Sequence, residues 1–431
     1  MTATTHPETL DAPLELDRTE SAAARRARLS TGVLMLTLGA LMAWLGFGTT
    51  GVANYALSDA FAAVALPTVA LPGLPVVLVC ALATLLAGAG FVSGRLWGRA
   101  KTTAATIAGL AIVLGFVTWA AAGRPFSFPV QNQLAGTIAL ATPLILGALC
   151  GVLCENAGVV NVAIEGQFLT AAFTAATVGS VTHSIAAALL AGVVAGVLMA
   201  VLLALFSIKY LVDQVVLGVV LNLLASGVTG FVFDQLVQPN SSELNRVPPI
   251  PRLPIPLLSD IPLIGPVLFN QTILVYLAFV SVAVVWFLLY RTRWGLRVRS
   301  VGEHPEAADT VGISVKAVRW QAVLAGGLFA GLGGAFFTIG SSVSFIKDIT
   351  VGNGFIALAA LIMGRWHPVR AALMALFFGF VTQLGSQLQT LQTPMPSQFL
   401  LMLPYLATII AVAGLIGRSR APKADGVPYT K

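Results

Sequence analysis

The sequence has few charged residues for its length. Only 10% of its 431 residues are Asp, Glu, Lys or Arg, whereas 57% are hydrophobic. Soluble domains carry about 25% charged residues. This shortage excludes an ordinary soluble protein and predicts an all-α, polytopic membrane protein built as a helical bundle. The net charge is +7, but the basic residues are spread over short loops and form no single basic face. Nucleic acid is therefore not an expected partner.

Residue types that carry catalysis or hold metals are also scarce. The three cysteines all lie in apolar runs, which argues against a disulfide framework. The four histidines are scattered, and no H-E-x-x-H motif is present. The phosphate-binding pattern G-x-x-x-x-G-K-[ST] is missing as well, so we do not expect the chain to hydrolyse ATP itself. We expect a protein that is not an enzyme, with no catalytic residues, no metal and no cofactor bound by this chain.

The N-terminus does not have the pattern of a signal peptide. About thirty mostly polar residues precede the first apolar run, whereas a cleavable signal begins with a short basic region. We expect residues 1–28 to form a disordered cytoplasmic tail. Arg25, Arg26 and Arg28 would then lie at the inner surface of the membrane.

Long apolar runs predict the membrane-spanning helices. A span requires about 20 mostly apolar residues, and by this rule the chain holds about twelve candidates, with ten to twelve as the range. They are predicted at residues 30–47, 74–93, 103–121, 132–153, 157–180, 184–206, 215–234, 272–290, 319–340, 352–364, 371–390 and 397–417. With both termini in the cytoplasm, all but four of the 24 Lys and Arg residues fall on the inner side, as expected for a membrane protein.

Polar segments separate these runs. Residues 48–73 are expected to form an outer loop. Residues 235–271 contain eight prolines, which prevent a continuous helix and predict a second outer loop. Residues 291–318 are rich in arginine and lie between two apolar runs, which places them on the cytoplasmic side. The last residues, 418–431, are polar and are expected to form a disordered cytoplasmic tail.

One apolar run contains polar side chains at membrane depth. It reads CENAGVVNVAIEGQF (154–168). A carboxylate at that depth is costly and usually faces a cavity or a partner. On a helix that begins at residue 157, Asn161 and Glu165 share one face, since they are four residues apart. We expect this pair to hydrogen-bond the hydroxyls or base edges of a polar solute. The alternative is that Glu165 lies near the membrane interface or fixes helix packing.

A second polar cluster reads SSVSFIKDITVGNGF (341–355). Its Gly-Asn-Gly step disfavours a helix interior, and irregular backbone near the membrane is tolerated where it lines a cavity or is buried in protein. We expect Asn353 to contact the solute and Phe355 to stack on a ring; the alternative is a plain outer turn. Asn222, within an apolar run, is a further candidate, although such an amide more often bonds a neighbouring helix. Glycines are dense in residues 325–340 and predict close helix packing, within the bundle or at a dimer seam.

Three segments, in this order, are similar to the signatures of one family. The run 154–168 resembles "E-x-x-G-V-V-N-I-x-x-E-G". The segment TRWGLRVRSVGEHPEAADTVGISV (292–315) resembles the cytoplasmic loop "G-x-x-x-R-A-x-G-x-N-P-x-A-A-x-x-x-G-I". The run GNGFIALAALIMGRWHP (352–368) resembles "G-x-G-F-x-A-I-A-x-A-x-x-G-x-x-x-P". From these, the chain resembles permease subunits of bacterial ABC importers, of the branched-chain amino acid and ribose-type family, over about residues 132–417. The Glu-Gly form of the first signature resembles the nucleoside and simple-sugar branch.

The resemblance implies an arrangement of parts. Residues 132–417 would be the permease transmembrane domain, and residues 29–131 would be additional N-terminal helices. The loop 291–318 would hold a short coupling helix that docks on an ATPase. The usual Asn before the motif's Pro is His304 in this chain. The candidate residues of the ATPase-coupling loop are Gly302, Glu303, Pro305, Glu306, Ala307, Ala308 and Gly312.

The resemblance also implies the partners. A separate ATPase subunit would bind ATP and Mg²⁺, a second permease, identical or different, would pair with this chain, and an extracytoplasmic solute-binding lipoprotein would deliver the solute. The expected function is inward transport of nucleosides of the guanosine or purine type across the bacterial plasma membrane. The alternative within the family is ribose or another simple sugar.

Two other classes of protein are rivals to this interpretation. An ion-coupled secondary transporter would show a buried acidic pair within its spans, and Glu165 is the only strong mid-span acid. A membrane scaffold would not require polar residues at the positions of Asn161 and Glu165.

Overall fold

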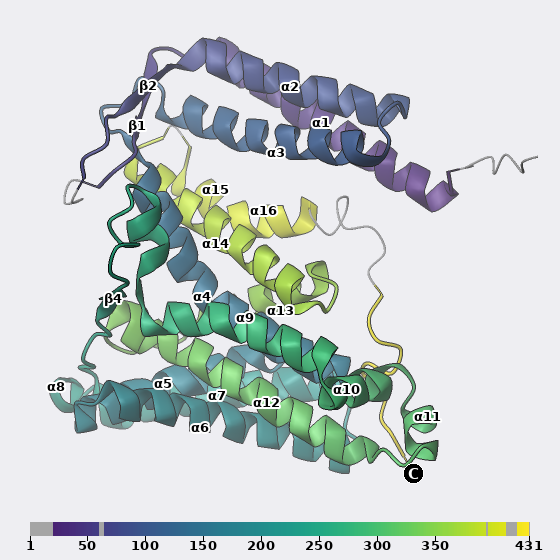
Figure 1. The fold of residues 1–431 in the computed structure, drawn as a ribbon. Coiled ribbons are helices and arrows are strands. Elements are labelled where there is room, and N and C mark those ends of the chain that lie inside the picture. The colour runs from purple at the N-terminus through teal and green to yellow at the C-terminus, as the bar shows by residue number, and fades with distance from the viewer. Residues whose placement is uncertain (1–19, 60–63, 394, 411–419, 431) are drawn as a thin grey trace, which may run out of the picture.

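The structure is a computed structural model that describes residues 20–59, 64–393, 395–410 and 420–430. Long helices run roughly side by side through it (Figure 1). Within the described ranges, nine helices are long and apolar enough to cross a membrane. The prediction of a polytopic helical membrane bundle is therefore confirmed.

Three of the predicted spans are not among these nine helices. Helix α5 (Ile164–Thr182) contains Glu165, Gln167 and several threonines, which lower its mean hydropathy. Helix α13 (Asn353–Met363) has 11 residues, fewer than the roughly 20 that a crossing requires. The run 397–417 contains α15 (Ser397–Leu401) and α16 (Leu403–Ile410) and continues beyond the described residues. The count of about twelve spans stays a prediction.

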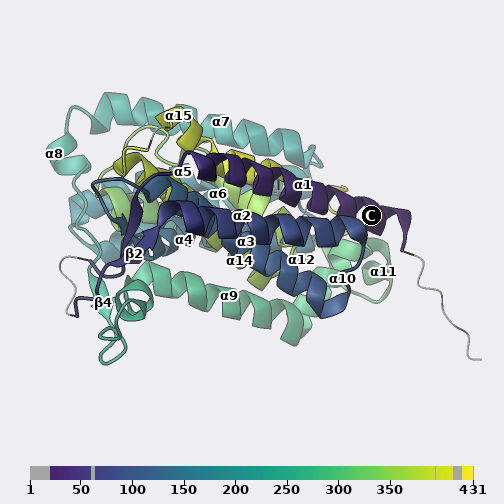
Figure 2. The same cartoon turned by 90° about the horizontal axis from the view of Figure 1, so that it is seen from above.

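The first three long helices form a layer of their own. They are α1 (Ala22–Phe47), α2 (Gly73–Ser93) and α3 (Gly98–Ala121). All three follow the long direction of the bundle and lie over its other helices (Figures 1 and 2). Residues 29–131 thus add a separate layer to the helices that carry the polar clusters.

Helix α1 begins inside the segment that we predicted to be a disordered tail. Ser21 caps its first turn by accepting a hydrogen bond from the backbone nitrogen of Ala24. Arg28 donates hydrogen bonds to the carbonyl oxygens of Phe91 and Val92, at the end of α2, over 2.6 and 2.9 Å. The prediction of disorder was therefore wrong for residues 22–28. Residues 1–19 lie outside the described residues.

One end of the bundle carries short strands. Strand β1 (Val52–Ala56) pairs antiparallel with β2 (Val69–Pro72) and parallel with β3 (Phe128–Pro129). Strands β4 (Arg252–Pro254) and β5 (Asn270–Thr272) form an antiparallel pair. All except β3 and the last residue of β5 belong to segments that we predicted to be outer loops.

The Pro-rich segment between α7 (Gln214–Val232) and α9 (Ile273–Arg291) has no long helix. It contains α8 (Ser241–Leu244), a π-helical turn at Gly265–Phe269 and strand β4. The prediction that its prolines prevent a continuous helix is confirmed.

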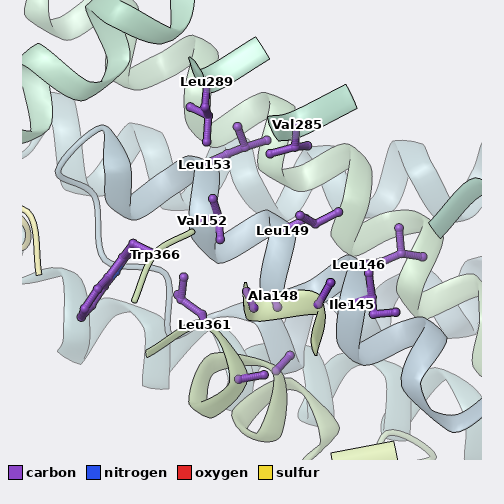
Figure 3. Close-up of a cluster of buried hydrophobic side chains, with 14 of the residues drawn as sticks. Ile145, Leu146, Ala148, Leu149, Val152, Leu153, Val285, Leu289, Leu361 and Trp366 are labelled. Carbon is purple, nitrogen blue, oxygen red and sulfur yellow. The ribbon is translucent and has the colours of Figure 1, made fainter. Parts of the chain in front are cut away.

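Helix α4 (Val130–Asn156) lies at the centre of the molecule. Its side chains are almost all buried in the half that ends at Asn156, and Leu146, Leu149 and Leu153 belong to the largest core cluster. Figure 3 shows them between Val285 of α9 and Leu361 of α13. Because lipid tails are as apolar as leucine, close packing rather than water exclusion holds such helices together.

Glycines bring α12 (Val315–Ala335) against α6 (Ile185–Ala204). A Cβ at Gly196 would lie 2.6 Å from the Cα of Gly331, so the two backbones are nearly in contact. The remaining long helix is α14 (Pro368–Thr390), which packs against α4. The glycines in the region of residue 330 therefore serve packing within the bundle.

The end opposite the strands carries the polar segment 291–318. It folds as α10 (Arg293–Glu303) and α11 (Pro305–Thr310) before α12 begins. The start of α1 and the C-terminal residues lie at this same end (Figure 1). Residues 420–430, which we predicted to be disordered, pack back onto it: Ala424 is buried and its backbone nitrogen donates to the carbonyl of Gly302 over 2.9 Å. That prediction was wrong for these residues.

Candidate functional site

The polar run 154–168 is not one continuous helix. Helix α4 ends at Asn156 and α5 begins at Ile164, so residues 157–163 are a non-helical break between them. Gly158 starts the break with a φ of +83°, a conformation that side-chain-bearing residues rarely adopt. The prediction of a helix from residue 157 was therefore wrong. The signal that we missed was the Asn-Ala-Gly step, which is typical of a helix end.

Asn161 lies in this break and its side chain is fully buried. Its Nδ2 donates to the Sγ of Cys150 over 3.2 Å and to Oε1 of Gln167 over 3.3 Å. Its Oδ1 accepts from the backbone nitrogen of Ala163 at 3.1 Å, which is a local cap for the start of α5. The shared helix face of Asn161 and Glu165 was therefore a wrong prediction, because Asn161 precedes the helix and points to α4. Its role in the solute path stays a prediction.

Asn222 of α7 also supports the break. Its Oδ1 accepts from the backbone nitrogen of Gly166 at 2.8 Å, and its Nδ2 donates to the carbonyl oxygen of Val162 at 3.0 Å. One amide side chain thus satisfies both a donor and an acceptor that an unbroken helix would have paired internally. Irregular backbone at membrane depth depends on such partners.

Glu165, in the first turn of α5, joins this helix to α13. Its Oε1 accepts hydrogen bonds from Thr350 Oγ1 at 2.6 Å and from the backbone nitrogen of Gly352 at 2.8 Å. Its Oε2 accepts from the backbone nitrogen of Gly354 at 2.6 Å. The carboxylate therefore lies at the N-termini of two helices, where backbone N–H groups and the helix dipoles favour negative charge. Our sequence analysis missed Thr350, whose place just before the Gly-Asn-Gly step was the available signal.

Gly354 permits the close approach of these two helices. A Cβ at this position would lie 2.4 Å from the backbone nitrogen of Glu165. Real Cβ atoms do not come that close to backbone atoms, so any other residue would separate α5 from α13. The Gly-Asn-Gly step is thus required for the junction itself.

The loop 343–352, which precedes α13, is strained. Val343, Asp348 and Val351 have positive φ values of 52°, 51° and 44°. Such a conformation costs about 1–2 kcal/mol for a residue with a side chain. Strain of this kind persists where the surroundings hold the backbone in place, and it concentrates at functional sites.

Three interactions hold this loop to the outer side of the bundle. Asn245 exchanges two hydrogen bonds with the backbone of Phe345, at 2.6 and 2.9 Å. Lys347 forms an ion pair with Asp234, with 2.5 Å between Nζ and Oδ2. Asp348 accepts a hydrogen bond from Ser226 of α7 at 2.8 Å. Together with the bonds to Glu165, these contacts make the segment a bonded junction rather than a plain outer turn.

Two further predicted residues lie at the start of α13. Asn353 is half-buried, and its Nδ2 donates to the carbonyl oxygen of Thr350 at 2.7 Å. The side chain of Phe355 is 48% exposed, next to Val351 at 71%. The structure therefore gathers Glu165, Asn353 and Phe355 around one junction. Their contact with a solute stays a prediction.

The predicted coupling segment folds as a short helix. Pro305 is the first residue of α11, a favoured place for proline, and Gly312 follows the helix with a φ of +83°. Glu303, Glu306 and Ala307 are exposed. The buried members are Gly302 and Ala308, with Pro305 half-buried. The segment therefore presents an exposed acidic helix end at the α10–α11 end of the bundle; its role in docking stays a prediction.

Comparison with known proteins identifies the family. The family model described as the branched-chain amino acid transport system / permease component matches residues 133–413. The chain belongs to this permease family. It is thus a multi-pass plasma-membrane transport component rather than an enzyme. No solved structure matches the chain significantly.

Several relatives resemble the permease over most of their length. The guanosine ABC transporter permease protein NupQ of Bacillus subtilis is 42% identical, over 68% of this chain and 95% of the relative. The nucleoside ABC transporter permease protein NupC of Lactococcus lactis is 41% identical, over 70% and 98%. The putative glucose ABC transporter permease protein TsgC13 of Haloferax volcanii is 33% identical, over 67% and 92%.

Proposed function

We propose that this permease carries nucleosides of the guanosine or purine type into the cell, with energy from a separate ATPase subunit. The observation that carries the proposal is the identity of 41–42% to two permeases named for guanosine or nucleoside transport, along nearly their whole length. The relative named for glucose is 33% identical. A simple sugar such as ribose is therefore the second candidate solute.

The charge of the α5–α13 junction supports an uncharged solute. Each helix N-terminus carries about +0.5 of an elementary charge, so two of them together offset roughly one carboxylate. Glu165 supplies that carboxylate and accepts three hydrogen bonds. The junction is consequently close to neutral. A phosphate or a free carboxylate would find no net positive charge there, whereas a nucleoside requires only hydrogen-bonding groups and an apolar or aromatic surface such as that of Phe355.

The expected partners follow from the family and its relatives. Bacillus subtilis has a second matching protein, the guanosine ABC transporter permease protein NupP, which is 23% identical to this chain, against 42% for NupQ. We infer that the permease pairs with a different chain of the NupP type. An ATPase that binds ATP and Mg²⁺ would dock on α11, and an extracytoplasmic solute-binding lipoprotein would dock on the outer segments.

Uptake of labelled guanosine tests the solute. Cells that lack the gene should lose most of the uptake, and adenosine should compete in the parent strain while ribose and leucine should not. If deletion leaves guanosine uptake unchanged, the nucleoside proposal fails and ribose becomes the next solute to test. Competition by leucine would contradict the proposed solute class.

Charge reversal on α11 tests the energy source. Glu306→Arg should abolish co-purification of the ATPase while the permease still inserts normally. The matched control is Glu243→Arg, at an exposed carboxylate on α8 at the other end of the bundle. If the ATPase co-purifies with Glu306→Arg at the parent level, the docking surface lies elsewhere.

A further inference from the structure

The C-terminal segment 420–430 makes contacts that its polar sequence does not suggest. It crosses the end of the bundle that carries α10 and α11, where the C label lies in Figure 1. Ala424 is 6% exposed, and its nitrogen donates to the carbonyl of Gly302, the residue before the last of α10. Tyr429 lines a cavity of about 360 Å³ together with Asp309, between α11 and α12. The segment thus bonds the end of α10 and shares a cavity with the loop that follows α11.

The same segment covers a buried arginine. Arg319, in the second turn of α12, is 2% exposed. Its Nη1 donates to the carbonyl of Val427 over 3.0 Å. Among the described residues, its Nε and Nη2 have no hydrogen-bond partner. A buried guanidinium is costly unless hydrogen bonds or opposite charges compensate it. Displacement of the segment would remove the hydrogen bond from Arg319 to Val427.

Ionisable groups of the C-terminal segment lie beside this guanidinium. Asp425 and Tyr429 of the C-terminal segment face Arg319. Glu155, at the end of α4, faces Asp425 and accepts a hydrogen bond from the indole of Trp366. The position of the C-terminal segment therefore affects the charge balance where α4 ends and α12 begins.

The segment also contacts the break before α5. A Cβ at Gly158 would lie 2.9 Å from the carbonyl oxygen of Ala424, and a Cβ at Gly426 would lie 3.4 Å from the side chain of Val160. Residues 157–163 lead directly into the turn that holds Glu165. One short peptide therefore contacts the coupling region on one side and the segment that carries the candidate site on the other.

We propose that the C-terminal segment 421–430 is a coupling element that transmits movement of α11 to the break 157–163 and so to the α5–α13 junction. The proposal rests on the proposed function, since it requires that an ATPase acts on α11. In this proposal the segment transmits movement between the two regions that it contacts. It does not contact the solute, and the ATPase docks on α11 rather than on the segment.

Two variants remove the contact. The first ends the chain after Arg420. The second, Ala424→Glu, places a charged side chain at a buried position and keeps the chain length. The matched control is Val427→Glu, because that side chain is 51% exposed and the backbone carbonyl that binds Arg319 remains. Each variant is assembled with its partner permease and ATPase. Three quantities are measured: protein in the membrane, ATPase retained on purification, and guanosine uptake with guanosine-stimulated ATP hydrolysis.

We expect the truncation and Ala424→Glu to retain the ATPase and the membrane level of the parent, to lower uptake at least tenfold, and to lose the stimulation of hydrolysis by guanosine. Val427→Glu should behave as the parent. Parent-like uptake in both variants would overturn the proposal. Loss of the ATPase on purification would also overturn it, because the segment would then serve docking. Loss of the protein from the membrane would overturn it as well, because the segment would then serve folding. Failure of the proposed function is distinct, because guanosine uptake would then not depend on the gene at all.

Discussion

Replacement of Glu165 by Gln tests whether one carboxylate holds α5 and α13 together. Gln has nearly the same shape, but one oxygen becomes an amide NH₂. The carboxylate accepts from three donors, on Thr350, Gly352 and Gly354. An amide has a single acceptor oxygen, so at least one of these donors would face another donor. We expect the loop 343–352 to loosen and guanosine uptake to fall by more than tenfold.

The loss of folding free energy in Glu165→Gln follows from the hydrogen bonds that the carboxylate accepts. A hydrogen bond to a charged group contributes about 1.5–3 kcal/mol, and a neutral one about 1 kcal/mol. The loss of one bond and the weakening of two, with the loss of about 0.3–1 kcal/mol from the charge at the helix N-terminus, amount to roughly 4 kcal/mol. Unfolding entropies near 2.1 cal/mol/K per residue give roughly 0.9 kcal/mol/K for 431 residues, so Tm should fall by about 4 °C.

The assay combines the thermal unfolding of the purified permease with uptake at equal protein level in the membrane. The matched control for thermal unfolding is Glu243→Gln, which removes an exposed carboxylate from α8 and should leave Tm unchanged. A Glu165→Gln variant with the Tm and the uptake of the parent would refute the reasoning. A lower Tm with unchanged uptake would restrict Glu165 to a structural role.

Three other changes test neighbouring parts of the structure. Asn222→Ala removes both bonds to the start of α5, so unfolding free energy should fall by about 2 kcal/mol, measured as a lower Tm. Gly354→Ala places a Cβ 2.4 Å from a backbone nitrogen of α5 and should abolish uptake, whereas Gly230→Ala meets nothing within 4 Å and should be neutral. Burial, opposed by the nearby guanidinium on α12, raises the pKa of Asp425 to about 7. In the docked segment the Asp425 carboxyl therefore keeps its proton up to about pH 7, whereas in the free segment it loses the proton near pH 4. Docking consequently weakens as pH rises through about 7. Proteolysis of the segment, relative to a denatured sample, should be faster at pH 8 than at pH 5, and Asp425→Asn should remove the difference.

The sequence predicts the long helices well because a single physical requirement determines them. A crossing must be apolar over about 20 residues, and polar residues end it. Helix α2 was predicted at 74–93 and runs from Gly73 to Ser93, and α9 was predicted at 272–290 and runs from Ile273 to Arg291. The short helix α11 was also predicted, from a motif rather than from hydropathy.

The sequence does not reveal contacts between residues that are far apart in the chain. Residues 157–163 are as apolar as a helix interior, but Asn222 and Asn161 satisfy their backbone and allow the break. Residues 420–430 are polar, and nothing local predicts that Gly302 and Arg319 would hold them. In both cases partners on other elements, namely Asn222, Gly302 and Arg319, hold the segment, and periodicity or composition does not reveal them.

The arrangement of polar side chains in the core has a functional meaning. A continuous helix would satisfy its own backbone, so a break inside the bundle requires side chains to supply the missing partners. Here Asn161 and Asn222 do so, and Glu165 joins α5 to a strained loop. A segment anchored by a few side-chain bonds can shift between discrete positions more readily than a helix with a complete ladder, as alternating access requires. The C-terminal peptide contacts both this break and the coupling region, which is why we infer that it transmits the movement.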